Sequence, residues 1–201
     1  MSNAGGMATV TRYTDMLAGN TVWNPWSPDG AFDALATVTV PSGGLASVTF
    51  AGIPNTYKHL QIRGIGRTNN SGGDPTQDYL RLRFNNDSGS NYSYHALFGD
   101  GSSATAGNAT SQTTAYIQRV SGNSSTSGIF GAFVLDILDY QNTNKNKTTR
   151  ILGGVDNNGS GRIYLTSNLW MNTSAVTQLD ISVGDGSLIS QHSQFTLYGV
   201  K

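Results

Sequence analysis

The chain has 201 residues, of which 12% are charged, and its 12 basic and 12 acidic side chains give a net charge of zero. This balance, with the eight arginines and four lysines scattered along the sequence, does not indicate the concentrated basic surface that binding to nucleic acid requires. The absence of cysteine excludes a disulfide framework, a thiolate metal site and a cysteine nucleophile. No apolar run is long enough to cross a bilayer, and no secretory signal is visible, so we expect a soluble protein.

Residues 1–34 differ in composition from the rest and are predicted to form an extended N-terminal arm. Trp23 and Trp26 alternate there with two prolines, which disfavour both a regular helix and a central strand. Either these indoles cap an open end of the core, or they act as interface anchors that reach a neighbouring subunit. Residues 1–6, followed by Met7, are either a cloning remnant or a native glycine-rich start.

Residues 35–201 are predicted to form one all-β domain. Short segments of alternating apolar and polar residues, rich in β-branched and aromatic side chains, are each ended by glycine, serine or asparagine. Residues 35–40 and 45–50 flank a Gly-Gly turn and suggest a hairpin, and residues 129–138 suggest a central strand. We expect further strands at residues 57–65, 79–84, 92–98, 114–120, 148–155, 163–167, 179–183 and 195–200. The leading architecture is a β-sandwich, with a jelly roll as the leading topology.

The alternation also predicts which side chains form the core, because residues two apart on a strand share a face. The predicted core comprises Leu60, Ile62, Leu80, Leu82, Phe84, Phe133, Leu135, Ile137, Leu179, Ile181 and Leu197. Truncation of Leu82 or Phe133 to alanine is expected to cost about 2–5 kcal/mol. Truncation of Arg67 is expected to cost little.

Few residues suggest catalysis. His59, His95 and His192 lie far apart in the sequence and have no zinc-binding spacing, and no G-x-S-x-G nucleophile motif occurs. Asp136 and Asp139 flank the last two residues of the run 129–138, but on a strand their spacing places them on opposite faces. We therefore interpret Asp136 as a satisfied strand residue and Asp139 as the cap of the following turn. The sequence predicts a protein that is not an enzyme.

Four loops rich in aspartate, asparagine and glycine resemble fragments of calcium-binding loops, at residues 85–89, 100–103, 156–161 and 185–186. None completes the EF-hand pattern, and the chain has no glutamate to supply a bidentate ligand. Tight turns explain these residues more simply, because asparagine, aspartate and glycine tolerate positive φ angles. We predict neither a metal nor a cofactor.

Several segments resemble small structural proteins of tailed bacteriophages, a poorly characterised family. The resemblance covers about residues 45–201 and excludes the arm. It is carried by residues 50–64, 80–89 with 92–95, 136–140 followed by 148–150, 169–172 and 195–201. It implies a virion component, made in the host cytoplasm, that decorates the head or forms part of a fibre or the tail, and it transfers no catalytic residues.

Two functional classes therefore remain. In the first, the chain is a structural and adhesive virion subunit that binds itself, as a homotrimer, and other virion proteins, with host-surface glycans as a further partner. In the second, it is a carbohydrate-binding β-sandwich in which exposed aromatic side chains stack on sugars. The candidate stacking residues are Tyr57, Tyr79, Tyr92, Tyr94 and Trp170.

Overall fold

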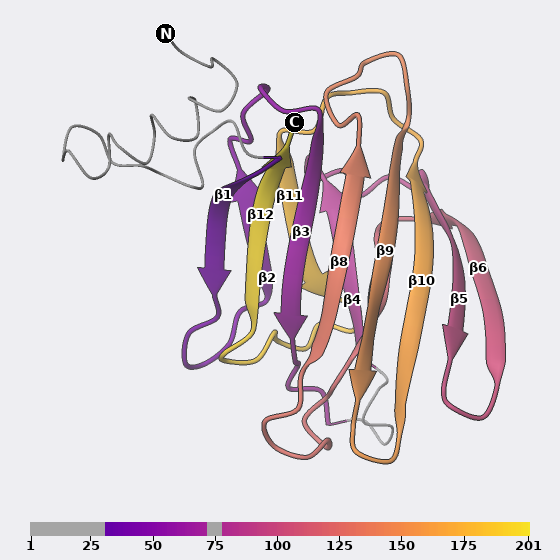
Figure 1. Cartoon of the computed structure of the whole chain (residues 1–201). Coiled ribbons are helices and arrows are strands. Elements are labelled where there is room, and N and C mark those ends of the chain that lie inside the picture. The colour runs from indigo at the N-terminus through magenta and orange to yellow at the C-terminus, as the bar shows by residue number, and fades with distance from the viewer. Residues whose placement is uncertain (1–30, 72–77) are drawn as a thin grey trace, which may run out of the picture.

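The computed structural model describes residues 31–71 and 78–201, which form twelve β-strands and no helix (Figure 1). The strands are Phe32–Thr39 (β1), Ser47–Ala51 (β2), His59–Gly66 (β3), Asp78–Phe84 (β4), Tyr92–Gly99 (β5), Ala104–Gln112 (β6), Ala115–Val120 (β7), Gly131–Leu138 (β8), Lys147–Asp156 (β9), Gly161–Trp170 (β10), Gln178–Val183 (β11) and Gln194–Val200 (β12). Trp23 and Trp26 lie outside the described residues.

The strands form two antiparallel sheets packed face to face, which confirms the predicted β-sandwich. The large sheet has eight strands in the order β1-β12-β3-β8-β9-β10-β5-β6, and the small sheet has four in the order β2-β11-β4-β7. In Figure 1 the large sheet lies in front of the small one and extends beyond it on the side of β5 and β6. The predicted central strand is β8, which pairs with β3 and β9.

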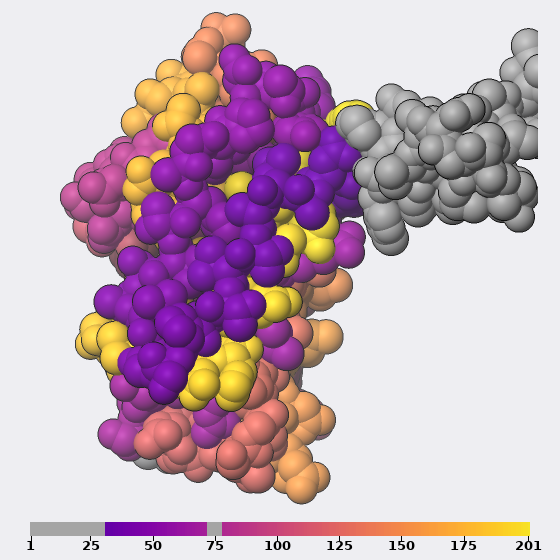
Figure 2. All heavy atoms as spheres, turned by 90° about the vertical axis from the view of Figure 1, so that its left-hand side faces the viewer, coloured from indigo at the N-terminus to yellow at the C-terminus, as the bar shows by residue number. Residues whose placement is uncertain are grey.

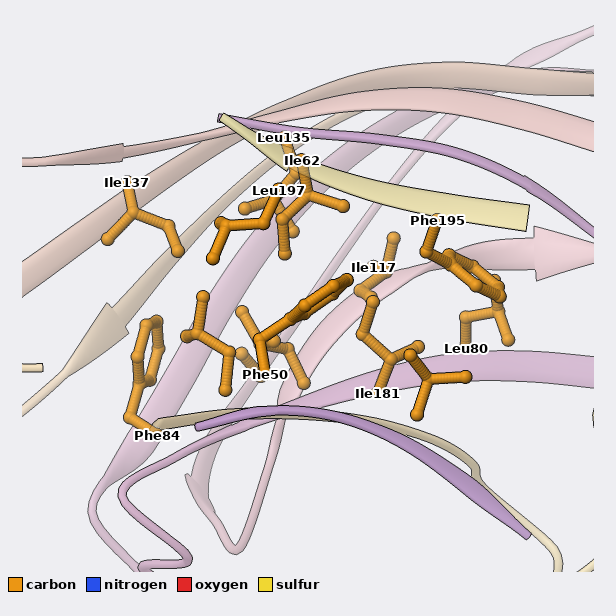
Figure 3. Close-up of a cluster of buried hydrophobic side chains, with 14 of the residues drawn as sticks. Phe50, Ile62, Leu80, Phe84, Ile117, Leu135, Ile137, Ile181, Phe195 and Leu197 are labelled. Carbon is orange, nitrogen blue, oxygen red and sulfur yellow. The ribbon is translucent and has the colours of Figure 1, made fainter. Parts of the chain in front are cut away.

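The core lies between the sheets and is aliphatic and aromatic throughout. Figure 3 shows Ile62, Leu135 and Leu197 from the large sheet facing Phe50, Phe84 and Ile181 from the small sheet. All the predicted core residues are buried, each with no more than 4% of its surface exposed. The period-two alternation is sufficient to find them because the strands that carry them point alternate side chains into the core.

The part of the large sheet that extends beyond the small one has a different interior. There Asn168 on β10 is buried and bonds the edge strand β7 as a neighbouring strand would. Its Oδ1 accepts from the Tyr116 N–H at 2.8 Å, and its Nδ2 donates to the Tyr116 carbonyl at 2.9 Å and to Thr149 Oγ1 at 3.0 Å. At Tyr116, the open edge of the small sheet is thereby satisfied by a side chain from the opposite layer.

Two local features differ from what the sequence predicted. Residues 35–40 and 45–50 do not form a hairpin, because β1 pairs with β12 in the large sheet whereas β2 pairs with β11 in the small sheet. Figure 2, which views the sandwich from this edge, shows the indigo residues of β1 beside the yellow residues of β12. Strand β6 was not predicted, because its sequence contains no large apolar residue.

Arg67 corrects a third expectation, since its side chain is 9% exposed and organises a loop. The guanidinium donates to four backbone carbonyls within residues 123–129 at 2.8–3.4 Å. Lys147, which is fully buried, plays the same role for another loop, with Nζ donating to the carbonyls of Asn142, Lys145 and Thr173 at 2.7–3.0 Å. Burial lowers the pKa of both side chains.

Candidate interaction surface

An apolar stripe crosses the outer face of the large sheet, on the side opposite the core. Leu97 on β5 pairs in register with Leu165 on β10, which pairs with Leu152 on β9, which pairs with Val134 on β8. Ile163 lies two residues before Leu165 on β10 and therefore on the same face. These five side chains are 38–62% exposed. Because adjacent strands lie about 4.8 Å apart, the stripe is continuous across four strands.

Strand β10 reverses the usual pattern of an amphipathic strand, because its exposed side chains include aliphatic ones and its buried side chains include polar ones. Its outward positions include Ile163 and Leu165, whereas its inward positions include Tyr164, Thr166 and Asn168, all of them buried. The inward polar residues follow from the contact with the edge of β7 described above. The outward aliphatic residues have no such structural explanation within the described chain, so this face has the character of an interface.

A row of polar side chains runs beside the stripe, where His95, Ser167, Arg150, Asp136 and Gln61 occupy successive strands. The Arg150 guanidinium donates to Asp136 Oδ2 at 2.8 Å, and Gln61 Nε2 donates to Asp136 Oδ1 at 2.8 Å. Both oxygens of Asp136 are therefore occupied, which confirms its interpretation as a satisfied strand residue.

Two grooves flank the stripe. The first has a volume of about 540 Å³ and is lined by side chains of both rows, including Leu97, Leu165, His95 and Arg150, with Asn108 on β6. The second has a volume of about 690 Å³ and lies toward the β5–β6 and β9–β10 hairpins. Its lining is rich in glycine, and it includes Gly99, Gly153, Gly154 and Gly161 beside Leu152 and Ile163.

The prediction of sugar stacking is wrong for two of the five aromatic residues. Tyr92 and Trp170 are buried, and the Trp170 ring stacks on Phe84 with ring centroids 5.1 Å apart. The Trp170 indole N–H donates to Asp87 Oδ2 at 2.8 Å, and burial raises the pKa of Tyr92 to about 12. Both rings complete the core at one end of the sandwich, because each finds a partner for its polar group inside.

The other three candidate stacking residues, Tyr57, Tyr79 and Tyr94, are half-buried, and Tyr57 belongs to a different cluster from the other two. Tyr57 packs against the main core, whereas Tyr79 and Tyr94 pack on Tyr116 with ring centroids 5.6 and 5.0 Å apart. The Arg81 guanidinium lies 4.9 Å from the centre of the Tyr79 ring. Stacking of a ligand on any of these rings stays a prediction.

Asp139 begins the turn after β8, as predicted for a cap. Its carboxylate contacts the ammonium groups of Lys145 at 2.7 Å and Lys58 at 3.0 Å, and these hydrogen bonds lower its pKa to about 2. Its backbone N–H donates to His59 Nδ1 at 2.9 Å. A carboxyl group this acidic remains ionised near neutral pH, so it is unsuited to act as a general acid.

In the calcium-like loops, the aspartate carboxylates accept hydrogen bonds from backbone N–H groups of the same turn. Asp100 Oδ1 accepts from the Ser102 and Ser103 N–H groups, Asp156 accepts from Asn158, and Asp185 accepts from Ser187. Among residues 31–71 and 78–201, no cluster of three or more histidine, aspartate or glutamate side chains is placed to hold a metal. Within the same residues no helix is long and apolar enough to cross a membrane.

Comparison with family models, with curated proteins and with solved structures finds no match to this chain. The interaction surface is therefore defined by its geometry alone. Its aliphatic members were not singled out from the sequence, although the run Ile-Tyr-Leu-Thr-Ser at residues 163–167 contains them. The missing information was which face of β10 points inward.

Proposed function

We propose that this chain is a non-enzymatic structural protein of a bacteriophage virion, exposed on the particle surface as a head decoration or as a fibre or tail component. The observation that carries the proposal is the apolar stripe on the outer face of the large sheet. An exposed aliphatic face of this kind is typical of a surface that binds another protein, and a subunit of an assembly needs such a surface.

The cost of leaving the stripe in water supports assembly. Burial of apolar surface is worth about 25 cal/mol per Å², so five aliphatic side chains that are 38–62% exposed represent several kcal/mol of unused binding energy. The net charge of zero and the low charged fraction reduce repulsion between closely packed copies. The segments that resemble phage structural proteins give the assembly its proposed context.

The topology supports the same class. Without the β5–β6 and β9–β10 hairpins, the remaining strands lie in the orders β1-β12-β3-β8 and β2-β11-β4-β7. We propose that these two four-stranded sheets represent a jelly roll, an architecture that viral capsid domains use. The two hairpins widen the large sheet and supply Leu97, Leu165 and Leu152, so these additions to the eight-stranded core carry most of the proposed interface.

Trp23 and Trp26 remain the proposed anchors of the arm, in a homotrimer or in contact with other virion proteins. The test compares the intact chain with one that lacks residues 1–30, because β1 begins at Phe32 and must be kept. We expect the shortened chain to fold with the same circular dichroism but to bind phage particles and itself less strongly. If both chains are monomers and neither cosediments with particles, the proposed function is wrong.

A second candidate function is carbohydrate binding in the 540 Å³ groove. His95, Asn108, Ser167 and Arg150 supply hydrogen-bonding groups there, and Leu97 and Leu165 supply apolar contacts. The lining contains no phenylalanine, tyrosine or tryptophan ring, so recognition of a sugar would depend mainly on hydrogen bonds. Binding to a glycan array that is lost in both His95→Ala and Arg150→Ala variants would favour this function.

A further inference from the structure

We propose that the outer face of the large sheet binds the same face of a second copy of this chain, about a two-fold axis that runs between β9 and β10 and parallel to them. This inference rests on the self-association proposed above and names the surface and its symmetry. A two-fold contact makes a dimer, or joins two trimers if the arm forms a separate three-fold contact.

The stripe matches itself about this axis. Rotation by 180° exchanges the positions of β9 and β10 and those of β8 and β5, while each row of side chains stays at its own level along the strands. Leu165 then faces Leu152 of the second copy, and Leu97 faces Val134 of the second copy. Two sheets packed face to face lie about 10 Å apart, which lets such side chains interdigitate.

The neighbouring row adds complementarity of shape. Ile163 is the most exposed of the stripe residues, at 62%, because its register partners on both sides are glycines, Gly99 on β5 and Gly154 on β9. The same axis places Ile163 over Gly154 of the second copy. Gly154 lines the 690 Å³ groove, so a protruding side chain of each copy meets a hollow in the other.

The polar row is compatible with the same arrangement. His95 faces Asp136 of the second copy, and Ser167 faces Arg150 of the second copy. Arg150 of each copy also flanks the axis and lies near Arg150 of the other, and the ion pair of each guanidinium with its own Asp136 offsets this like charge. The zero net charge of the chain imposes no long-range repulsion on the approach.

The face is large enough for a stable contact. The proposed axis superimposes six strands, from β3 to β6, because β1 and β12 have no counterpart on the other side. At about 4.8 Å apart and about nine residues long, these strands present roughly 850 Å². A standard interface buries about 800 Å² on each partner. The contact can therefore reach standard size on this face alone, with the apolar stripe at its centre and polar residues around it, which is the usual anatomy of a protein interface.

The first test substitutes glutamine, which is similar in size to leucine and polar. We expect Leu152→Gln and Leu165→Gln in the intact chain to raise the dissociation constant of self-association at least about tenfold. Ile65→Gln is the matched control, because Ile65 is 43% exposed on the same face but lies on β3, farther from the axis. We expect this control to change the dissociation constant less than about threefold. Unchanged melting temperatures would show that all three variants fold.

The second test uses the absence of cysteine, which makes any introduced thiol unique. Because β9 and β10 flank the axis, Leu152→Cys and Leu165→Cys should each cross-link to themselves through a bis-maleimide with a spacer of about 10 Å. Ile65→Cys should not, since five strand spacings of about 4.8 Å separate the two copies of that residue.

The two proposals fail in different ways. If the intact chain self-associates but Leu152→Gln and Leu165→Gln associate equally well, this inference is wrong and the self-association proposed above survives through another surface. If they bind particles less strongly without changing self-association, the stripe contacts another virion protein, and the inference is again wrong. If the intact chain is a monomer at several hundred micromolar and binds no particles, both proposals are wrong.

Discussion

Arg67→Ala should destabilise this protein as strongly as the loss of a core side chain. Arg67 follows the last residue of β3. Its guanidinium donates hydrogen bonds to the backbone carbonyls of Asn123, Ser125, Thr126 and Ile129. These residues belong to the loop between β7 and β8. Truncation leaves the four carbonyls without this donor.

The magnitude follows from the number and kind of these bonds. A hydrogen bond to a charged group contributes about 1.5–3 kcal/mol, although water can replace part of that at the exposed side of the loop. Three of the four bonds are 2.9 Å or shorter. We expect a loss of about 3–5 kcal/mol in the free energy of unfolding, or roughly 10 °C in melting temperature. Arg67→Lys should recover only part of this, because an ammonium group has three donors.

Urea denaturation followed by tryptophan fluorescence measures this loss, with Arg150→Ala as the control. The Arg150 side chain is 69% exposed in a surface ion pair, so its truncation should cost no more than about 1 kcal/mol. Hydrogen exchange should also become faster in the loop between β7 and β8 of the Arg67→Ala variant. If Arg67→Ala costs less than about 1 kcal/mol, the guanidinium does not hold this loop and the reasoning is refuted.

Three further predictions concern stability. Leu82→Ala and Phe133→Ala should each cost about 2–5 kcal/mol in urea denaturation, and equal effects below 1 kcal/mol would remove both from the core. Hydrogen bonds from Asn91, from the Gly89 N–H and from Trp170 lower the pKa of Asp87 to about 2. Asp87 thus stabilises the fold above its unfolded pKa of about 3.9, and the urea midpoint should fall between pH 4 and pH 2. Asp87→Asn should flatten that profile, and a profile unchanged by the substitution would contradict this assignment. EDTA should leave the melting temperature unchanged, whereas a decrease restored by calcium would reveal a metal site.

The architecture could be predicted from the sequence because most of the strands around the core bury alternate residues. Period-two alternation identifies Leu80, Leu82 and Phe84 without any knowledge of their neighbours. The pairing partners of the strands could not be predicted in this way, because the alternation does not specify which strands lie side by side. The two segments on either side of Gly43 and Gly44 belong to different sheets, although turn chemistry favours a hairpin between them.

The interaction surface and Arg67 could not be predicted for a related reason. The inward face of β10 is set by the contact between Asn168 and the edge of β7, which joins segments far apart in the sequence. Without that contact, Ile163 and Leu165 would be assigned to the core. Arg67 likewise gains its importance from carbonyls nearly sixty positions away, and no local pattern reveals such a partner.

Sedimentation equilibrium of the intact chain across the micromolar range tests the central claim most directly. If the outer face of the large sheet is an assembly surface, the average mass should rise with concentration from that of one chain to at least twice that value. The same rise should be absent or displaced to higher concentration in Leu165→Gln. A single-chain mass at every concentration, together with no association with phage particles, would contradict the account.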